Sequence, residues 1–240
     1  SPAARNGTVW DALATAVWAV RHHSSFEDAV VAAVDAGDDA DTVGAITGGL
    51  AGALWGAGAI PSRWTTYLHG TALDETYRLA DLQDLARRLA GATPVPLAAD
   101  EPGLGAAQVR PGLWVGNLTD AADHDGDVAM ISLCRPKGHH VRRPVRREVY
   151  LVDRDGSHNP ALDVVLGDVL DSIAAFRNEG RDVFVHCHSG RSRTGLVLRA
   201  WLMAHEGLDY EQALTEAKER WPHLTTVNGR FEQRLRHGPS

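Results

Sequence analysis

Apolar residues recur at helical spacing through the first third of the chain. In residues 8–20, 26–34, 41–55 and 79–90 an apolar side chain returns every three or four positions, which is the pattern of a helix with one buried face. The pattern predicts that residues 7–91 are helical throughout.

Local signals mark the helix boundaries in this part. Thr8 and Ser25 are each followed three residues later by Asp, a spacing that allows the hydroxyl and the carboxylate to cap a helix start. Gly37 and Gly91 stand where two of the periodic stretches stop. We therefore expect separate short helices and an all-α segment.

The pattern changes after residue 91. Residues 91–108 hold three Pro and three Gly without an apolar period, which is typical of a connection between domains. Beyond this stretch, apolar runs of strand length alternate with helical periods, and strands that feed helices indicate an α/β domain with a central sheet flanked by helices. The strands are expected at 113–116, 128–134, 149–152 and 183–186, and the helices at 160–179, 194–206, 210–220 and 227–236.

These patterns predict two domains in a chain of 240 residues, which is long enough for two modest cores. The helical segment is expected to span residues 1–92 and the α/β domain residues 109–240. Residues 93–108 are expected to link them.

The run HCHSGRSRTG at residues 186–195 joins a predicted strand to an apolar helix. Such a loop directs backbone N–H groups and the positive end of a helix toward one point, so it can hold a phosphate dianion. The same field favours the thiolate of Cys187 and makes it a nucleophile. Arg193 offers a planar fork for two phosphate oxygens, and Gly190 permits the backbone curl. Thr194 can donate a hydrogen bond to the sulfur when it becomes a leaving group.

This run resembles the signature of the protein-tyrosine/dual-specificity phosphatases, His-Cys-x-x-Gly-x-x-Arg-Ser/Thr, and meets each fixed position. The resemblance extends over residues 109–237. It implies a hydrolase of phosphomonoesters that needs no cofactor and forms a thiophosphate on Cys187. The residues expected to surround the phosphate are His188, Ser189, Gly190, Arg191, Ser192 and Arg193.

The resemblance also implies a general acid, an Asp that protonates the leaving oxygen and later activates water. In the family this Asp lies thirty-odd residues before the cysteine. Asp153 and Asp155 lie 34 and 32 residues before Cys187, and the sequence leaves open which of them is the acid. His158 is a weaker third candidate.

Two extra basic residues, His188 and Arg191, lie within the loop, and in this respect it resembles the phosphoinositide-directed branch of the family. Residues 134–147 add six Lys or Arg and two His. This stretch is either a solvated basic loop or a funnel for a polyanionic substrate. We therefore expect the substrate to be a phosphorylated protein or a polyanionic small molecule.

Residues 37–56, followed by 59–64, resemble the C-terminal part of the ADP-ribosylglycohydrolase family. A Gly-x-Asp-x-Asp-Thr motif opens a helix in that family and supplies oxygen ligands to a pair of Mg²⁺ ions. Carried over, the ligands are Asp39, Asp41 and Thr42, which are oxygen donors of the kind that Mg²⁺ prefers. The family's other ligands belong to its N-terminal portion, so the resemblance implies an incomplete metal site here.

Composition bears on the possible partners of the chain and on its cellular compartment. The formal charge of −7 argues against non-specific nucleic-acid binding, and no apolar run approaches the ~20 residues of a membrane span. Two cysteines are too few for a disulfide framework, so we expect a reducing cytoplasm. The first residue is Ser rather than Met, and no basic-then-apolar leader follows, so a fragment of a longer chain is expected.

We therefore expect a bacterial-style fusion in which the tail of an ADP-ribosylglycohydrolase domain precedes a cysteine phosphatase. One alternative is that removal of ADP-ribose is the main activity of a longer parent protein. Another is that the phosphatase part is a catalytically weak module that binds phosphate groups.

Overall fold

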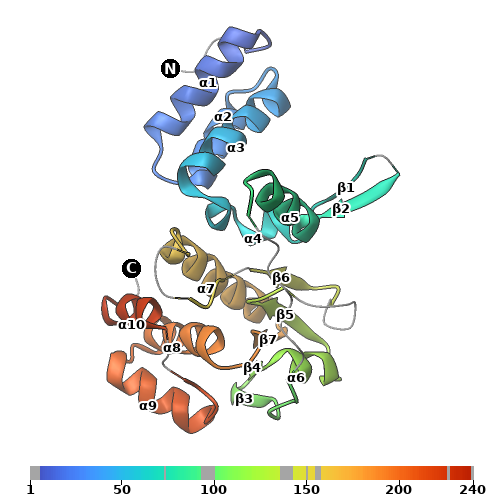
Figure 1. The fold of residues 1–240 in the computed structure, drawn as a ribbon. Helices are drawn as coiled ribbons and strands as arrows, with labels where there is room; N and C mark the ends of the chain where they lie inside the picture. The colour runs from blue at the N-terminus through green and yellow to red at the C-terminus, as the bar shows by residue number, and fades with distance from the viewer. Residues whose placement is uncertain are drawn as a thin grey trace. The chain divides into compact units, whose positions relative to one another are not determined.

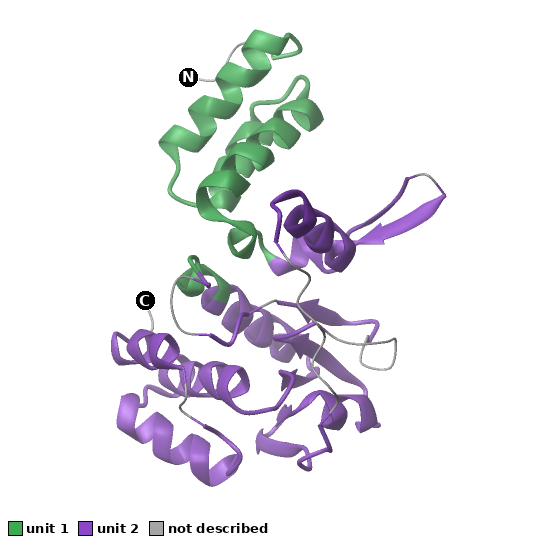
Figure 2. Ribbon diagram, in the orientation of Figure 1, with its two compact units in different colours: residues 1–61, 160–165 green, residues 62–159, 166–240 purple. Residues whose placement is uncertain are grey.

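The structure, a computed structural model, describes residues 6–72, 74–92, 101–135, 143–149, 151–154, 158–225 and 228–238. The chain divides into two compact units (Figure 2). The first comprises residues 1–61 and 160–165, and the second comprises residues 62–159 and 166–240. Among the described residues, none of the helices has the length and apolar content that a membrane crossing requires.

The first unit is built from helices α1 (Val9–His22), α2 (Phe26–Asp35) and α3 (Ala40–Trp55) and a 3₁₀ turn, η1 (Ala57–Ala59). The expected starts are confirmed, because the hydroxyls of Thr8 and Ser25 cap α1 and α2. Small side chains line the contacts between these helices, which lets their backbones approach closely. One buried cluster consists of Ala12, Ala19, Ala33 and Val43, and another of Phe26, Ala51 and Ala59.

The second unit opens with α4 (Ser62–Thr65), an antiparallel hairpin of β1 (His69–Ala72) and β2 (Glu75–Arg78), and α5 (Leu79–Leu89). The prediction of helix throughout residues 7–91 is wrong at the hairpin. Thr71, Thr76 and Tyr77 favour strands over helix, and this stretch lacks a helical apolar period.

A mixed five-stranded sheet forms the centre of the second unit, in the order β3-β4-β7-β5-β6. β3 pairs antiparallel with β4, and the other neighbours are parallel. The central strands β5 and β7 are almost entirely buried, as apolar runs of parallel strands require. The strands are β3 (Ala107–Arg110), β4 (Leu113–Gly116), β5 (Val128–Ser132), β6 (Arg146–Glu148) and β7 (Asp182–His186).

Helices cover both faces of this sheet, with α6 on one face and α7 and α8 on the other (Figure 1). Met130 and Phe184 pack against Leu118 of α6, so the alternate residues of β5 and β7 point to the opposite face. This arrangement confirms the predicted α/β domain. The helices are α6 (Leu118–Asp123), α7 (Leu162–Asn178), α8 (Ser192–Glu206), α9 (Tyr210–Arg220) and α10 (Gly229–Arg236).

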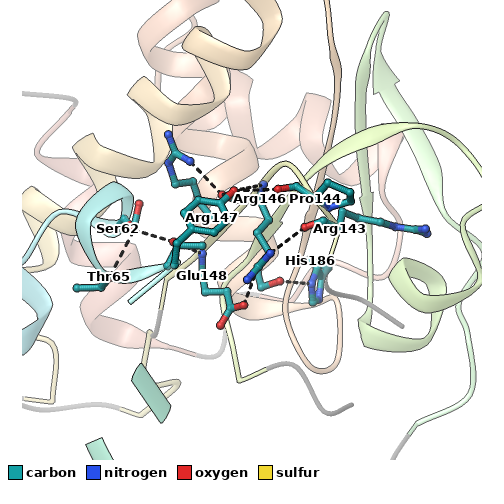
Figure 3. A network of polar contacts seen from close by, with 11 residues as sticks. Ser62, Thr65, Arg143, Pro144, Arg146, Arg147, Glu148 and His186 are labelled. Atoms are coloured by element: carbon teal, nitrogen blue, oxygen red, sulfur yellow. Dashed lines mark hydrogen bonds and ion pairs between the residues drawn. The ribbon is translucent and has the colours of Figure 1, made fainter. Parts of the chain in front are cut away.

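The edge strand β6 is closed by side chains from the segment that follows α4. The backbone N–H of Arg146 donates to the Tyr67 hydroxyl (3.2 Å), and that of Glu148 donates to the Thr66 hydroxyl (3.1 Å). The Arg146 guanidinium lies 4.8 Å from the centre of the Tyr67 ring. It also binds Glu148 (Figure 3). The outward N–H groups of this strand are therefore satisfied, which removes an open edge.

One strand prediction needs correction, and one strand forms where none was expected. No strand forms over the described residues of 149–152, because β5 ends at Ser132 and the pairing with β6 ends there too. After that point the backbone of Val152 is held instead by the Asn159 side chain, at 2.9 and 2.8 Å. β3 begins at Ala107, inside the range expected to be a linker.

Candidate active site

Cys187 follows β7 directly and lies at the centre of the sheet's C-terminal edge, between the ends of β4 and β5. The parallel register pairs Gly116 and Ser132 with His186. The thiol is 1 % exposed, and four residues separate it from the first turn of α8. The predicted strand–loop–helix is thus present, with the cysteine at its base.

His186 anchors the start of this loop. Its side chain is fully buried, and its Nε2 lies 2.7 Å from the Ser132 hydroxyl of the neighbouring strand. Burial is the main cause that lowers the pKa of His186 to about 4; the contact with the Cys187 carbonyl raises this pKa, and the positive Arg193 lowers it. The imidazole is therefore neutral near neutral pH and acts as a fixed hydrogen-bonding group beside the cysteine.

Gly190 is required by both conformation and space. Its φ of +65° lies in the left-handed region, which side chains other than hydrogen adopt at a cost. A Cβ at this position would lie 2.9 Å from the backbone nitrogen of Asn117 and 3.0 Å from the carbonyl of Gly116. The loop therefore passes directly over the end of β4.

Two carbonyls of the loop point outward to defined partners. The His188 carbonyl accepts from the Leu118 N–H at 3.1 Å, and the Gly190 carbonyl accepts from the Trp221 indole N–H at 2.6 Å. Because the C=O and N–H of a trans peptide are antiparallel, the next N–H groups, of Ser189 and Arg191, point in the opposite direction. This is the orientation that an oxyanion-binding loop requires.

Arg193 is held on one edge by the backbone of two neighbouring segments. Its Nη1 donates to the carbonyls of Leu133 and Leu151, each at 3.2 Å, and its side chain is 13 % exposed. The Nε is buried and forms no hydrogen bond within the described part of the chain, although Oδ2 of Asp153 lies 3.8 Å from it as an ion pair. Binding of phosphate oxygens by this guanidinium stays a prediction.

Of the two candidate acids, Asp153 is the one that the structure describes, whereas Asp155 lies outside the described residues. Asp153 contacts the loop itself: Oδ1 accepts from the Ser192 hydroxyl at 2.9 Å, and Oδ2 lies 3.8 Å from Nε of Arg193. His158 is exposed. The general-acid assignment therefore stays a prediction.

The other predicted loop residues differ in their surroundings. The Ser189 hydroxyl donates to Glu101 at 2.7 Å, and Arg191 is exposed. The Thr194 hydroxyl is fully buried and has no hydrogen-bond partner among the residues that the structure describes. Its bond to the Cys187 sulfur stays a prediction.

The described arginines of the basic stretch are engaged in contacts with the protein. Arg135 pairs with Asp84 of α5 at 3.0 Å, and Arg143 donates to the His124 carbonyl. Arg146 binds Glu148, and Arg147 lies over the Phe176 ring at 4.9 Å. These four arginines therefore contribute more to the fold than to an open funnel, and Arg191 adds an exposed cation in the loop itself.

Cys134 provides a contrast to Cys187. It follows β5, is buried, and forms no disulfide. Burial raises the pKa of the Cys134 thiol to about 12, although the nearby Arg193 acts in the opposite direction. Near neutral pH this thiol is protonated and inert as a nucleophile.

In the first unit, the proposed metal ligands Asp39, Asp41 and Thr42 lie at the start of α3. A hydrogen bond with Asp39 is the largest of the effects that lower the pKa of the exposed Asp41, so the two side chains lie together. Among the described residues, however, no three His, Cys, Asp or Glu side chains gather as a metal site would require. Magnesium binding by these residues stays a prediction.

Several residues that support these sites were missed from the sequence. Asn6 is fully buried and ties the turn before α3, where its Oδ1 accepts from Asp39 N–H at 2.8 Å. Trp221, Glu101 and Asn228 contact the loop or Asp153 from 31 to 88 residues away. No local pattern in the sequence marks such distant partners.

Comparisons with known proteins find two families along this chain. A family model described as the dual specificity phosphatase catalytic domain matches residues 129–237, and one described as ADP-ribosylglycohydrolase matches residues 2–97. Dual specificity protein phosphatase 15 of Rattus norvegicus is 28 % identical over 141 residues, covering 55 % of this chain and 57 % of the relative. The crystal structure of human DUSP28 is 24 % identical, covers 58 % of this chain and 97 % of that one, and has a TM-score of 0.47.

The N-terminal part is similar to the ADP-ribosylarginine hydrolase Tri1 of Serratia proteamaculans (strain 568), with 40 % identity over 84 residues. That match covers 35 % of this chain and 21 % of the relative, so the chain spans only a fifth of that relative's length. Residues 129–237 therefore form a domain of the dual specificity phosphatase type, and part of an ADP-ribosylglycohydrolase domain precedes it.

Proposed function

We propose that this chain hydrolyses phosphomonoesters through a covalent thiophosphate on Cys187. The Cys187 thiolate attacks phosphorus, the phosphorus–oxygen bond to the leaving group breaks, and the leaving oxygen takes a proton from an Asp. A water molecule then gives its proton to that Asp and attacks phosphorus. Inorganic phosphate leaves and the thiolate is restored.

The observation that carries this proposal is the surroundings of Cys187. The thiol lies at the base of a loop whose amide N–H groups at Ser189 and Arg191 point away from the outer partners of the loop. Arg193 is fixed beside it by two backbone carbonyls. Preorganised donors of this kind stabilise the charge that develops on the transferring phosphoryl group.

The test is turnover of an aryl phosphate by Cys187→Ser. We expect less than about 1 % of wild-type kcat, because a Ser hydroxyl is not ionised near neutral pH, while binding of a phosphate analogue is retained. Cys134→Ala is the matched control, since this protonated thiol should leave kcat unchanged. Turnover by Cys187→Ser near the wild-type rate would reject the thiophosphate mechanism.

Arg193→Lys probes the second element of the site. A lysine is a point charge and does not reproduce the bidentate fork of a guanidinium. We expect both KM and kcat to worsen. Kinetics equal to wild type would mean that phosphate binds somewhere other than this loop.

For the general acid, Asp153 and Asp155 remain the candidates, and substitution of the true acid by Asn should lower kcat by ~10²–10⁴ with a poor leaving group. His158 follows if neither matters. The substrate class that we propose is a phosphorylated protein or a polyanionic small molecule. Detectable turnover of any phosphomonoester would exclude the alternative of a module that only binds phosphate.

A second function, cation binding by the first unit, is favoured by the contact between Asp39 and Asp41. Two carboxylates and the Thr42 hydroxyl offer too few ligands to hold two Mg²⁺ ions. We propose weak Mg²⁺ binding without ADP-ribosyl hydrolysis by these 240 residues. Release of ADP-ribose from a modified protein, abolished by Asp41→Ala, would reject this.

A further inference from the structure

Asp153 is tied to the phosphate-binding loop by each of its oxygens. Oδ1 accepts from the Ser192 hydroxyl at 2.9 Å and from the Asn228 amide at 3.2 Å, and Oδ2 faces Nε of Arg193 at 3.8 Å. The carboxylate therefore contacts the two residues that begin α8. A general acid, in contrast, has to direct an oxygen toward the leaving group of the substrate.

The other side of Arg193 is also constrained. Its Nη1 is held by the carbonyls of Leu133 and Leu151. With Asp153 on the Nε side and two carbonyls on the Nη1 side, rotation of the guanidinium plane is restricted. A fixed plane matters because a bidentate Arg–phosphate contact depends on orientation as well as charge.

Asn228 completes the support. It is the residue before α10, is 4 % exposed, and uses Oδ1 to accept from the N–H of Phe231 at 3.2 Å. Since Oδ1 is occupied in this cap, the amide nitrogen is the end that faces Asp153. Asp153 is thus held from α10 as well as from the loop.

We propose that Asp153 is a positioning residue, which fixes Ser192 and the guanidinium of Arg193 for phosphate binding and does not itself donate the proton. This inference rests on the proposed phosphatase function. The general acid is then another residue, and Asp155 stays the candidate for it from its distance to Cys187 in the sequence.

The discriminating comparison is Asp153→Ala with Asp153→Asn. Alanine removes every contact, whereas asparagine keeps an acceptor oxygen for Ser192 and Asn228. For Asp153→Ala we expect KM for an aryl phosphate and Kd for tungstate to rise about tenfold, the effect of losing a hydrogen bond to a charged group. For Asp153→Asn we expect both constants within about threefold of wild type, the scale of one partly exposed ion pair.

A general acid would behave differently, because neither Ala nor Asn carries the required proton. The measurements are the pH profile of kcat and the dependence of kcat on the leaving group across a series of aryl phosphates. Both limbs of the profile and the wild-type leaving-group dependence should persist in the two Asp153 variants. Asp155→Asn is the matched control: it should lose one limb, react most slowly with poor leaving groups, and bind tungstate normally.

Three outcomes would overturn the proposal. The first is that Asp153→Ala and Asp153→Asn lose kcat equally and that one limb of the pH profile of kcat disappears in both. This result would mean that Asp153 is the general acid. Another is tighter tungstate binding by Asp153→Ala, which would make Asp153 a competitor of phosphate. The third is wild-type tungstate binding by Asp153→Ala. Failure of the phosphatase mechanism itself shows separately, as activity that survives Cys187→Ser.

Discussion

Gly190 is needed in the loop both for its backbone conformation and for the space around it. A methyl group there would meet the backbone of the end of β4, and its φ of +65° would be strained. We expect Gly190→Ala to lower kcat/KM at least tenfold, roughly the effect of a small displacement of catalytic groups, because the loop has to shift away from the geometry that binds phosphate.

The matched control is Gly180→Ala. Gly180 also has a positive φ, +77°, but no atom lies within 4 Å of the position that an alanine methyl group would take. That variant should lose about 1 kcal/mol of unfolding free energy and keep its activity. Equal activity of the two variants, measured by initial rates on an aryl phosphate, would show that the loop tolerates displacement.

His186 predicts a pH dependence of stability. Its pKa is lowered to about 4 in the folded chain, against an ordinary value near ~6.5 in the unfolded chain. Above pH ~6.5 both states are neutral and the group has no effect; as pH falls toward ~4, only the unfolded chain takes up the proton. Roughly 3 kcal/mol of stability should therefore be lost across this interval.

The measurement is urea unfolding between pH ~7.5 and pH ~4 for wild type and for His186→Gln, which retains hydrogen-bonding atoms but does not titrate. The difference between their unfolding free energies should shrink as pH falls. A difference that is independent of pH would mean that the pKa of His186 is the same in the folded and the unfolded chain.

At the scale of elements, the edge strand β6 depends on a segment that precedes it by almost 80 residues. The outward N–H groups of Arg146 and Glu148 are satisfied by the hydroxyls of Tyr67 and Thr66. Tyr67→Phe removes one of these partners and should cost about 1 kcal/mol of unfolding free energy.

Tyr77→Phe, in the exposed hairpin, removes a hydroxyl whose hydrogen bond is to Glu75 at 3.3 Å and is the control. Its effect should be close to zero. Denaturant unfolding followed by tryptophan fluorescence compares the two. If both substitutions are neutral, β6 does not need its hydroxyl cap.

How far the sequence predicts this structure differs between the elements. The strand, loop and helix around Cys187 agree with the prediction, because the residues that form them are consecutive, whereas the chemical roles of these residues stay predictions. The strand β6 was missed because its residues Arg146–Glu148 are polar and acquire a strand only through β5 and Tyr67. The support of Asp153 by Asn228 depends on a contact 75 residues apart, which no local period encodes.

For the whole molecule, the excess of acidic residues gives a net charge of −7, yet the exposed Arg191 stands in the loop that is proposed to bind phosphate. A substrate with a second phosphate should have a higher kcat/KM because of this charge. This advantage should fall as salt is added, since the Debye length shortens to ~8 Å at physiological ionic strength. We expect Arg191→Ala to reduce the ratio of kcat/KM for a multiply phosphorylated substrate to that for a phosphotyrosine peptide.

The two substrates should be compared at two salt concentrations in wild type and Arg191→Ala. Arg63→Ala, which removes an arginine that contacts Asp168 outside the loop, controls for net charge. If wild type prefers the peptide and Arg191→Ala leaves that ratio unchanged, the loop arginine is only solvated and the substrate is an ordinary phosphoprotein.

The first unit also has a consequence for how the chain folds during synthesis. Its core around Phe26, Ala51 and Ala59 is completed by Ala161, and Gly56 lies against Pro160. About 100 residues therefore separate its two pieces, and a ribosome needs roughly 5–20 s to translate them. During that interval part of the apolar surface of helices α2 and α3 stays exposed. A nascent chain stalled before residue 160 should therefore be the form that chaperones bind most readily.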